Sequence, residues 1–172
     1  MPFESISSST SQKETSAWAM RMIERGYGAA FRMERAIRVV RDCRTIKDTL
    51  KIADRFLVAY HDLAFAASDA EAHGEPEYIQ GTRTGLDGFV TQLRVQFPRC
   101  VAMYTDARKA VLAKAKGGKR QLAIAAKSLD TLRQYEGRAN WRDKPDECQH
   151  SVDAAIAYWV DQTALLEQDA RA

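Results

Sequence analysis

The residues of this 172-residue chain that are best suited to bind a ligand are basic, and they are concentrated between positions 99 and 144. That segment holds 12 Lys and Arg residues against 4 Asp and Glu, a net charge of +8, whereas the whole chain carries only +3. Positive side chains at this density can neutralise the phosphates of a nucleic acid. The candidate binding residues in this segment are Arg108, Lys114, Lys116, Lys119, Arg120, Lys127, Arg133, Arg138 and Arg142.

The run Lys114–Arg120 (KAKGGKR) is the most concentrated part of this segment. It lacks the G-x-x-x-x-G-K-[ST] spacing of a nucleotide-binding P-loop, and no strand is predicted before it. It is instead typical of a tight turn between two helices, with a positively charged tip that can bind phosphate. The alternative is that Lys residues at a helix C-terminus only complement the helix dipole and solvate the turn.

A second basic series uses only Arg and begins at Arg21, Arg25 and Arg32. Arg forms forked hydrogen bonds with phosphate or carboxylate groups and stacks on flat groups, which favours recognition over solubility alone. At 100° per residue these three positions lie within about 40° of one another on a helix. We therefore include them in the candidate nucleic-acid surface.

Aromatic residues accompany the basic ones, above all in the segment 135–144 (YEGRANWRDK). Trp141 in a predicted loop is a candidate for stacking on single-stranded bases beside phosphate contacts. The alternative is that Trp141 folds back and closes the end of a helical bundle.

Other kinds of site have weaker support. Glu147 and His150 have the Glu-x-x-His spacing of di-metal helical bundles, but no second such pair exists. Cys43 and Cys100 lie on or beside apolar stripes, where Cys usually behaves as a small hydrophobe. The sequence predicts no catalytic residue, metal or cofactor and therefore no enzyme, although it leaves a cryptic catalytic site open.

The elements that must position the basic residues are helices. Nine Gly and four Pro are too few for a turn-rich β fold, and apolar residues recur at steps of three and four. We predict an all-α, single-domain antiparallel bundle of about five helices. The expected elements are helices over 12–43 and 46–72, a loop over 73–81, a third helix from about 86 to 116 with a kink at Pro98, a fourth from about 119 to Gly137, and a fifth starting at Pro145.

The composition also predicts the character of the N-terminal segment and the cellular location of the protein. Residues 1–11 include the small polar tract SISSSTS and are expected to form a flexible tail before a bundle domain over 12–172. Three Cys residues without paired spacing favour a reducing compartment, and no signal peptide or membrane-spanning stretch is evident. The expected location is the cytoplasm, without membrane association.

The functional hypothesis rests on how charge is segregated. The segments 1–60, 61–98, 99–144 and 145–172 carry +4, −4, +8 and −5. The leading hypothesis is a non-enzymatic subunit that binds DNA or RNA backbone within a larger assembly, with protein partners or self-association through opposite patches. The alternative is a protein-only adaptor, chaperone or inhibitor that binds an acidic or basic protein partner.

Overall fold

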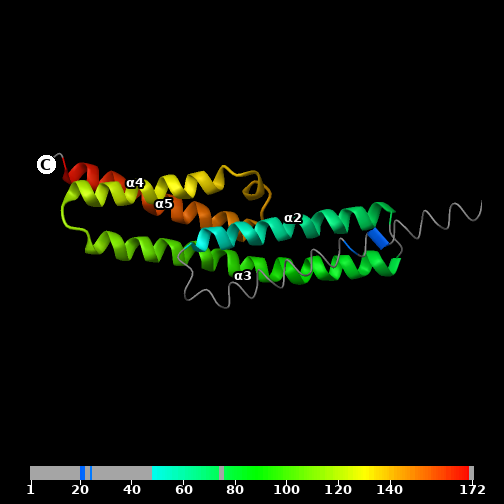
Figure 1. Ribbon diagram of the computed structural model, residues 1–172. Helices are drawn as coiled ribbons and strands as arrows, with labels where there is room; N and C mark the ends of the chain where they lie inside the picture. The colour runs from blue at the N-terminus through cyan, green and yellow to red at the C-terminus, as the bar shows by residue number, and fades with distance from the viewer. Residues whose placement is uncertain (1–19, 22–23, 25–47, 74–75, 171–172) are drawn as a thin grey trace, which may run out of the picture.

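The computed structural model describes residues 20–21, 24, 48–73 and 76–170, and every regular element in these ranges is helical. The all-α prediction is therefore confirmed for this part of the chain. Most of the predicted helix over 12–43, and the whole tail over 1–11, lie outside the described residues, so the count of five helices stays a prediction. The described elements are α2 (Thr49–His73), α3 (Pro76–Lys114), α4 (Gly118–Glu136), the short 3-10 helix η1 (Ala139–Trp141) and α5 (Asp146–Asp169) (Figure 1).

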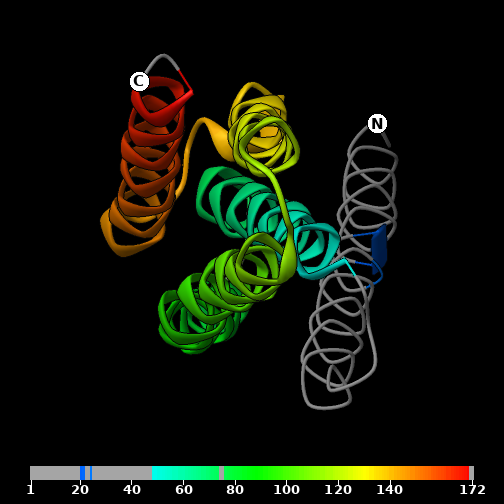
Figure 2. The same cartoon turned by 90° about the vertical axis from the view of Figure 1, so that its left-hand side faces the viewer.

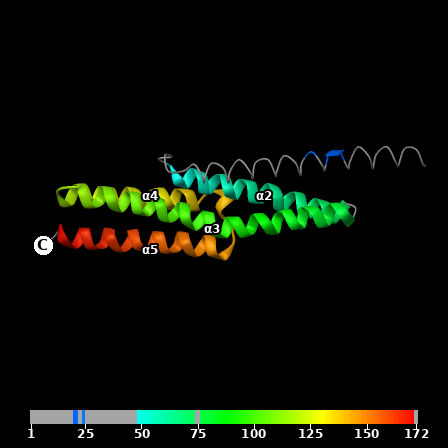
Figure 3. The same ribbon diagram turned by 90° about the horizontal axis from the view of Figure 1, so that it is seen from below.

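Helix α3 is the longest described element and links two helical pairs. Helix α2 packs on its first half, and α4 and α5 lie beside its second half (Figures 1 and 3). All four helices run along the long axis of the bundle in the side views (Figures 1 and 3), and the end view shows that they are tilted relative to one another (Figure 2). Since an α-helix rises 1.5 Å per residue, the 39 residues of α3 are about 58 Å long, and the bundle is elongated. Among the described helices, none has the length and apolar character needed to cross a membrane.

Aromatic rings from four elements form the middle of the core. Phe56 of α2 faces Phe89 of α3 with ring centroids 6.2 Å apart. Trp141 of η1 lies between Phe97 of α3 and Tyr135 of α4, at centroid distances of 5.0 and 5.3 Å. Burial of such large rings stabilises the contacts between these elements.

Helix α5 continues this core along the second half of α3. Its buried residues Cys148, Val152, Ala155 and Trp159 recur at steps of four and three, which places them on one face of the helix. The helix begins at Asp146, directly after Pro145, and has Asp146 and Glu147 in its first turn. Acidic residues there favour the positive end of the helix dipole, so the predicted start is correct to within one residue.

The predicted loop over 73–81 is wrong from Pro76 onward, because α3 begins there. Proline suits the first turn of a helix, since its fixed φ is helical and its missing N–H would have no helical acceptor. Glu77 follows in the first turn, and the ion pair between Arg83 of α3 and Glu71 of α2, at 2.7 Å, links the two helices soon afterwards. The connection between α2 and α3 is therefore much shorter than the composition suggested.

Two other boundaries need comment. Helix α2 begins at Thr49 and not near residue 46, because the side chain of Asp48 caps it by accepting a hydrogen bond from the N–H of Lys51 at 3.2 Å. Helix α3 continues through Pro98 as a single helix, in agreement with the unbroken phase of its apolar stripe. The kink at Pro98 stays a prediction.

Candidate nucleic-acid interface

The turn between α3 and α4 carries four exposed basic side chains, which we call the basic tip: Lys114, Lys116, Lys119 and Arg120. The chain reverses here because the N–H of Ala115 bonds to the carbonyl of Leu112 at 3.0 Å and Gly117 adopts a φ of +89°. The N–H groups of Arg120 and Gln121 then bond to the carbonyl of Gly117 and start α4. The sequence prediction of a tight basic turn between two helices is confirmed in this geometry.

The two halves of the basic tip differ in what they do for the fold. Lys114 is in the last turn of α3, where a positive charge complements the helix dipole. Lys119 and Arg120 are in the first turn of α4, which has no acidic residue. Positive charge at a helix N-terminus opposes the dipole and costs about 0.3–1 kcal/mol per residue. Complementing the helix dipole therefore accounts for Lys114 but not for Lys119 and Arg120.

The basic surface continues from the tip along one side of α4. At 100° per residue, Lys119, Arg120, Lys127 and Arg133 fall within an arc of about 140°, and Lys119 and Arg133 are about 21 Å apart along the axis. All four are exposed, and none forms an ion pair with a described residue. We call this side the α4 outward face; its exposed residues are Lys119, Arg120, Ala123, Lys127, Asp130, Arg133 and Gln134.

Arg108 has a different role from the one predicted. Its Nε donates a hydrogen bond to Ser128 Oγ at 2.9 Å, and its Nη2 donates to the carbonyl of Ile124 at 3.4 Å. Tyr104 also donates to the carbonyl of Ser128, at 3.3 Å. The partly buried Arg108 therefore links α3 to the inner side of α4, opposite the exposed basic residues.

Arg138 is likewise occupied within the protein. Its Nη1 lies 3.2 Å from a carboxylate oxygen of Asp54, and its guanidinium lies over the ring of Tyr135, 4.0 Å from the centroid. Its side chain remains 47 % exposed, so one face is still accessible to solvent. Its neighbour Arg142 is exposed and has no ion-pair partner among the described residues.

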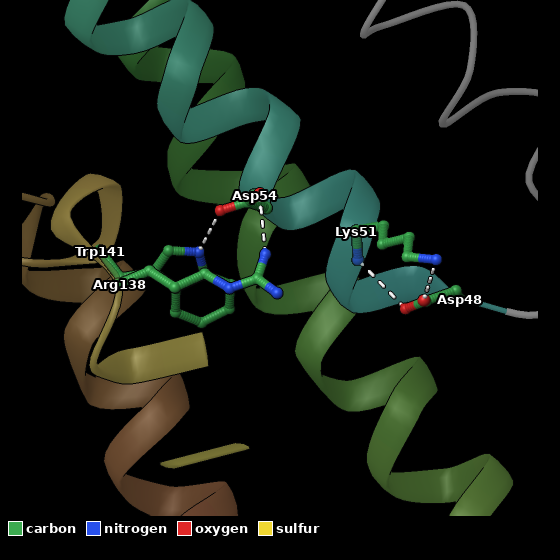
Figure 4. Close-up of polar contacts among 5 residues, drawn as sticks. All are labelled: Asp48, Lys51, Asp54, Arg138 and Trp141. Carbon is green, nitrogen blue, oxygen red and sulfur yellow. Dashed lines mark hydrogen bonds and ion pairs between the residues drawn. The ribbon is translucent and has the colours of Figure 1, made fainter. Parts of the chain in front are cut away.

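The prediction that Trp141 is exposed for base stacking is wrong, because the side chain is completely buried. Its rings contact Phe97 and Tyr135, and its indole Nε1 donates to Asp54 at 2.8 Å (Figure 4). Tyr135 is also in the core, and burial is the main reason that its pKa is raised above the ordinary value. The alternative interpretation, in which Trp141 folds back against the bundle, describes the structure.

The remaining predicted residues belong to the first Arg series. Arg21 is exposed, and Arg25 and Arg32 lie outside the described residues. The structure therefore brings together the basic tip with Lys127 and Arg133, and gives no placement for the first Arg series relative to them.

Acidic residues flank the basic tip. The C-terminal end of α5 lies at the same end of the bundle as the turn between α3 and α4 (Figures 1 and 3). Asp161, Glu167 and Asp169 are exposed on this helix, and its last turn has no basic residue. A long anion would meet repulsion on the α5 side, so the outward face of α4 is the favoured approach.

Other chemistry has little support in residues 48–73 and 76–170. Glu147 pairs with Arg94 at 3.3 Å, and no group of three or more metal-ligating side chains is found in the described part of the chain. His61 Nε2 lies 2.9 Å from the carbonyl oxygen of Asn140. Cys100 and Cys148 are buried, and burial raises the pKa of the Cys148 thiol to about 12. A buried neutral thiol is a poor nucleophile, so this residue is structural.

Comparison with protein-family models, with characterised proteins and with solved structures gave no match for this chain. Its function must therefore be inferred from the chemistry of its own surface. The surface with the clearest chemistry is the basic tip and the α4 outward face, on a helix that packs against α3 and α5.

Proposed function

We propose that this protein is a non-enzymatic helical subunit that binds the phosphate backbone of a nucleic acid through the basic tip and the α4 outward face. The observation that supports this most is the placement of Lys119 and Arg120 in the first turn of α4 without an acidic partner in the described structure. A bound phosphate would stabilise both side chains and would also interact favourably with the positive end of the helix dipole.

The spacing of the charges supports a polymeric anion over a single phosphate. The basic tip is at one end of α4, and Lys127 and Arg133 extend the positive charge about 21 Å along it. A small anion would contact only one or two of these residues. A nucleic-acid backbone presents charge continuously over that length and can release counterions at each contact.

A second candidate is an acidic protein partner, and the acidic end of α5 favours it. The C-terminal half of α5 carries the exposed residues Asp161, Glu167 and Asp169, and this helix ends at the same end of the bundle as the turn between α3 and α4 (Figure 1). A protein surface with both charge signs would complement this pattern, whereas a uniform polyanion complements only the basic part. In either case the protein would function as part of a larger assembly.

The decisive experiment compares two double variants. One removes two positive charges from the proposed surface, and the other removes two positive charges from elsewhere on the protein. The variant Lys119→Gln/Arg120→Gln should bind labelled nucleic acid more weakly, and the slope of log K against log salt should decrease by about 2 in magnitude. The variant should also be as stable as the parent protein or slightly more stable, because it removes the conflict with the helix dipole. Weak binding therefore cannot be attributed to unfolding.

The matched control is Arg55→Gln/Arg99→Gln, which has the same change in net charge. Both residues are exposed, on α2 and α3, and neither belongs to the proposed surface. The control should bind like the parent protein. Absence of binding at about 50 mM salt, or equal losses in both double variants, would contradict the proposal. Binding to polyglutamate without binding to nucleic acid would favour the second candidate instead.

A further inference from the structure

We infer that the nucleic acid bound by this surface is double-stranded and is contacted through its backbone alone. The inference rests on the proposed function and specifies the form of its ligand. Three features of the described structure support it. The basic tip and the α4 outward face carry no aromatic residue, α4 is supported by packing against its neighbours, and the basic residues are spaced along the length of α4.

The first feature concerns stacking. Proteins that bind single strands without sequence preference combine basic grooves with aromatic side chains on which the bases stack. The residues of the basic tip and the α4 outward face are Lys, Arg, Ala, Asp and Gln, and none is aromatic. A single strand on this surface would therefore gain charge contacts only.

The aromatic residues next to this surface are occupied in the core. Trp141 is fully buried, and Tyr135 is 6 % exposed. The guanidinium of Arg138 covers the ring of Tyr135 at 4.0 Å from the centroid. A base could reach either ring only if the packing between η1, α2 and α4 opened.

The second feature is the rigidity of α4. Its inner side packs on α5 and α3, and Arg108 and Tyr104 of α3 donate hydrogen bonds to Ser128 and Ile124 from behind. The backbone of α4 that carries the four basic residues of its outward face is therefore held in place, and these residues are spread over about 21 Å of its length. A flexible single strand would lose conformational freedom to align with them, whereas the phosphates of a duplex are already ordered.

The third feature is charge density. Duplex DNA carries one negative charge per about 1.7 Å of its axis, so about 21 Å of α4 faces a dense array of phosphates. The salt slope of log K is about −0.9 per phosphate contact for a duplex and about −0.7 for a single strand. For contacts from Lys119, Arg120, Lys127 and Arg133 the slopes are about −3.6 and −2.8. If the two affinities are equal at about 1 M salt, this difference in slope makes binding of the duplex about tenfold tighter at about 50 mM salt.

The test compares one DNA duplex of about 20 base pairs, about two helical turns, with each of its separated strands. The full chain is titrated against each labelled DNA at several salt concentrations. We expect the duplex to bind about tenfold more tightly than either strand, with the steeper salt dependence. Duplexes of unrelated sequence should bind equally well, because phosphate contacts carry no sequence information directly.

The outcome separates this inference from the proposed function. Tight binding of single strands, equal to or better than that of the duplex, would overturn the inference but leave nucleic-acid binding in place. No binding of any of the three DNAs at about 50 mM salt would overturn both. The Lys119→Gln/Arg120→Gln variant shows whether duplex binding uses the proposed surface, since its affinity for the duplex should decrease and that of Arg55→Gln/Arg99→Gln should not.

Discussion

The indole Nε1 of Trp141 donates a hydrogen bond to Asp54 Oδ1 at 2.8 Å and so connects η1 to α2 across 87 positions of sequence (Figure 4). The other carboxylate oxygen of Asp54 accepts a hydrogen bond from Arg138 at 3.2 Å. Lys144 also donates a hydrogen bond to the carbonyl of Trp141, and burial is the main reason that the pKa of its ammonium is lowered. One carboxylate on α2 therefore holds the connection between α4 and α5 in place.

Replacing Asp54 should destabilise the protein, because it would leave a buried indole N–H without an acceptor. We expect Asp54→Ala to lower the free energy of unfolding by about 1–3 kcal/mol, measured by urea denaturation. Asp54→Asn keeps an acceptor oxygen and should cost less. Equal stability of Asp54→Ala and the parent protein would show that this hydrogen bond does not contribute to folding.

Two adjacent glycines at the basic tip should respond in opposite ways to alanine. Gly117 has a φ of +89°, which a residue with a Cβ adopts only with strain, so Gly117→Ala should cost about 1–2 kcal/mol. Gly118 is the first residue of α4 and has no positive φ, so Gly118→Ala should be neutral or stabilise by up to about 1 kcal/mol. A Cβ at either position meets open space, so the contrast isolates the backbone effect. Thermal unfolding of both variants measures it, and equal melting temperatures would contradict the assigned turn.

The buried thiols should resist modification in the folded state. In a Cys43→Ser background the remaining residues, Cys100 and Cys148, are both buried. With a pKa near 12 in place of 9.0, Cys148 has about a thousandfold less thiolate at pH 8 than an ordinary thiol. We expect a chromogenic disulfide reagent to label neither thiol in the native protein and both in urea. Rapid labelling of Cys148 in the native protein would contradict its assigned environment.

The same pKa shift predicts how stability depends on pH. The unfolded thiol ionises near pH 9 and the folded thiol only near pH 12, so the stability that Cys148 contributes is complete below about pH 9 and decreases as the pH rises toward 12. The difference in free energy of unfolding between the parent protein and Cys148→Ala should therefore narrow between pH 8 and about pH 11. A constant difference in free energy across this range would show that folding does not raise the pKa of Cys148.

The helical stripes could be predicted well from the sequence, because periodic apolar residues need a common core. Leu93, Phe97 and Cys100 in α3, and Val152 and Trp159 in α5, recur at steps of three, four and seven and are buried. The start of α3 was missed because Pro76 and three glycines obscure the periodicity there. Packing against α2 and the ion pair of Arg83 compensate for the low helix propensity of this segment.

The candidate site was predictable only in part. Exposure of the basic tip follows from its position in a turn. Burial of Trp141 and the internal role of Arg108 do not, because both depend on partners far away in sequence, Asp54 and Ser128. Nothing local to Asp54 indicates that its carboxylate accepts a hydrogen bond from the indole of a residue 87 positions later. Charge alone identifies a basic segment, whereas the fold decides which of its members face outward.

The acidic residue on the α4 outward face offers the last prediction. Asp130 is exposed and lies three residues from both Lys127 and Arg133, within the arc of the basic side chains. If a duplex lies along this face, Asp130 repels a nearby phosphate. A unit charge about 7 Å away in water contributes about 0.6 kcal/mol, so Asp130→Asn should tighten duplex binding about threefold at low salt.

The control for this variant is Asp87→Asn. Asp87 is also exposed, but it lies on α3, about 26 Å along the helix from Tyr104, where α3 supports α4. At about 0.1 M salt the Debye length is about 10 Å, so removal of the Asp87 charge should leave binding unchanged. An equal increase in both variants would show that affinity follows net charge alone. An increase confined to Asp130→Asn would place the phosphates along the α4 outward face, because only a nearby ligand responds differently to the removal of two exposed carboxylates.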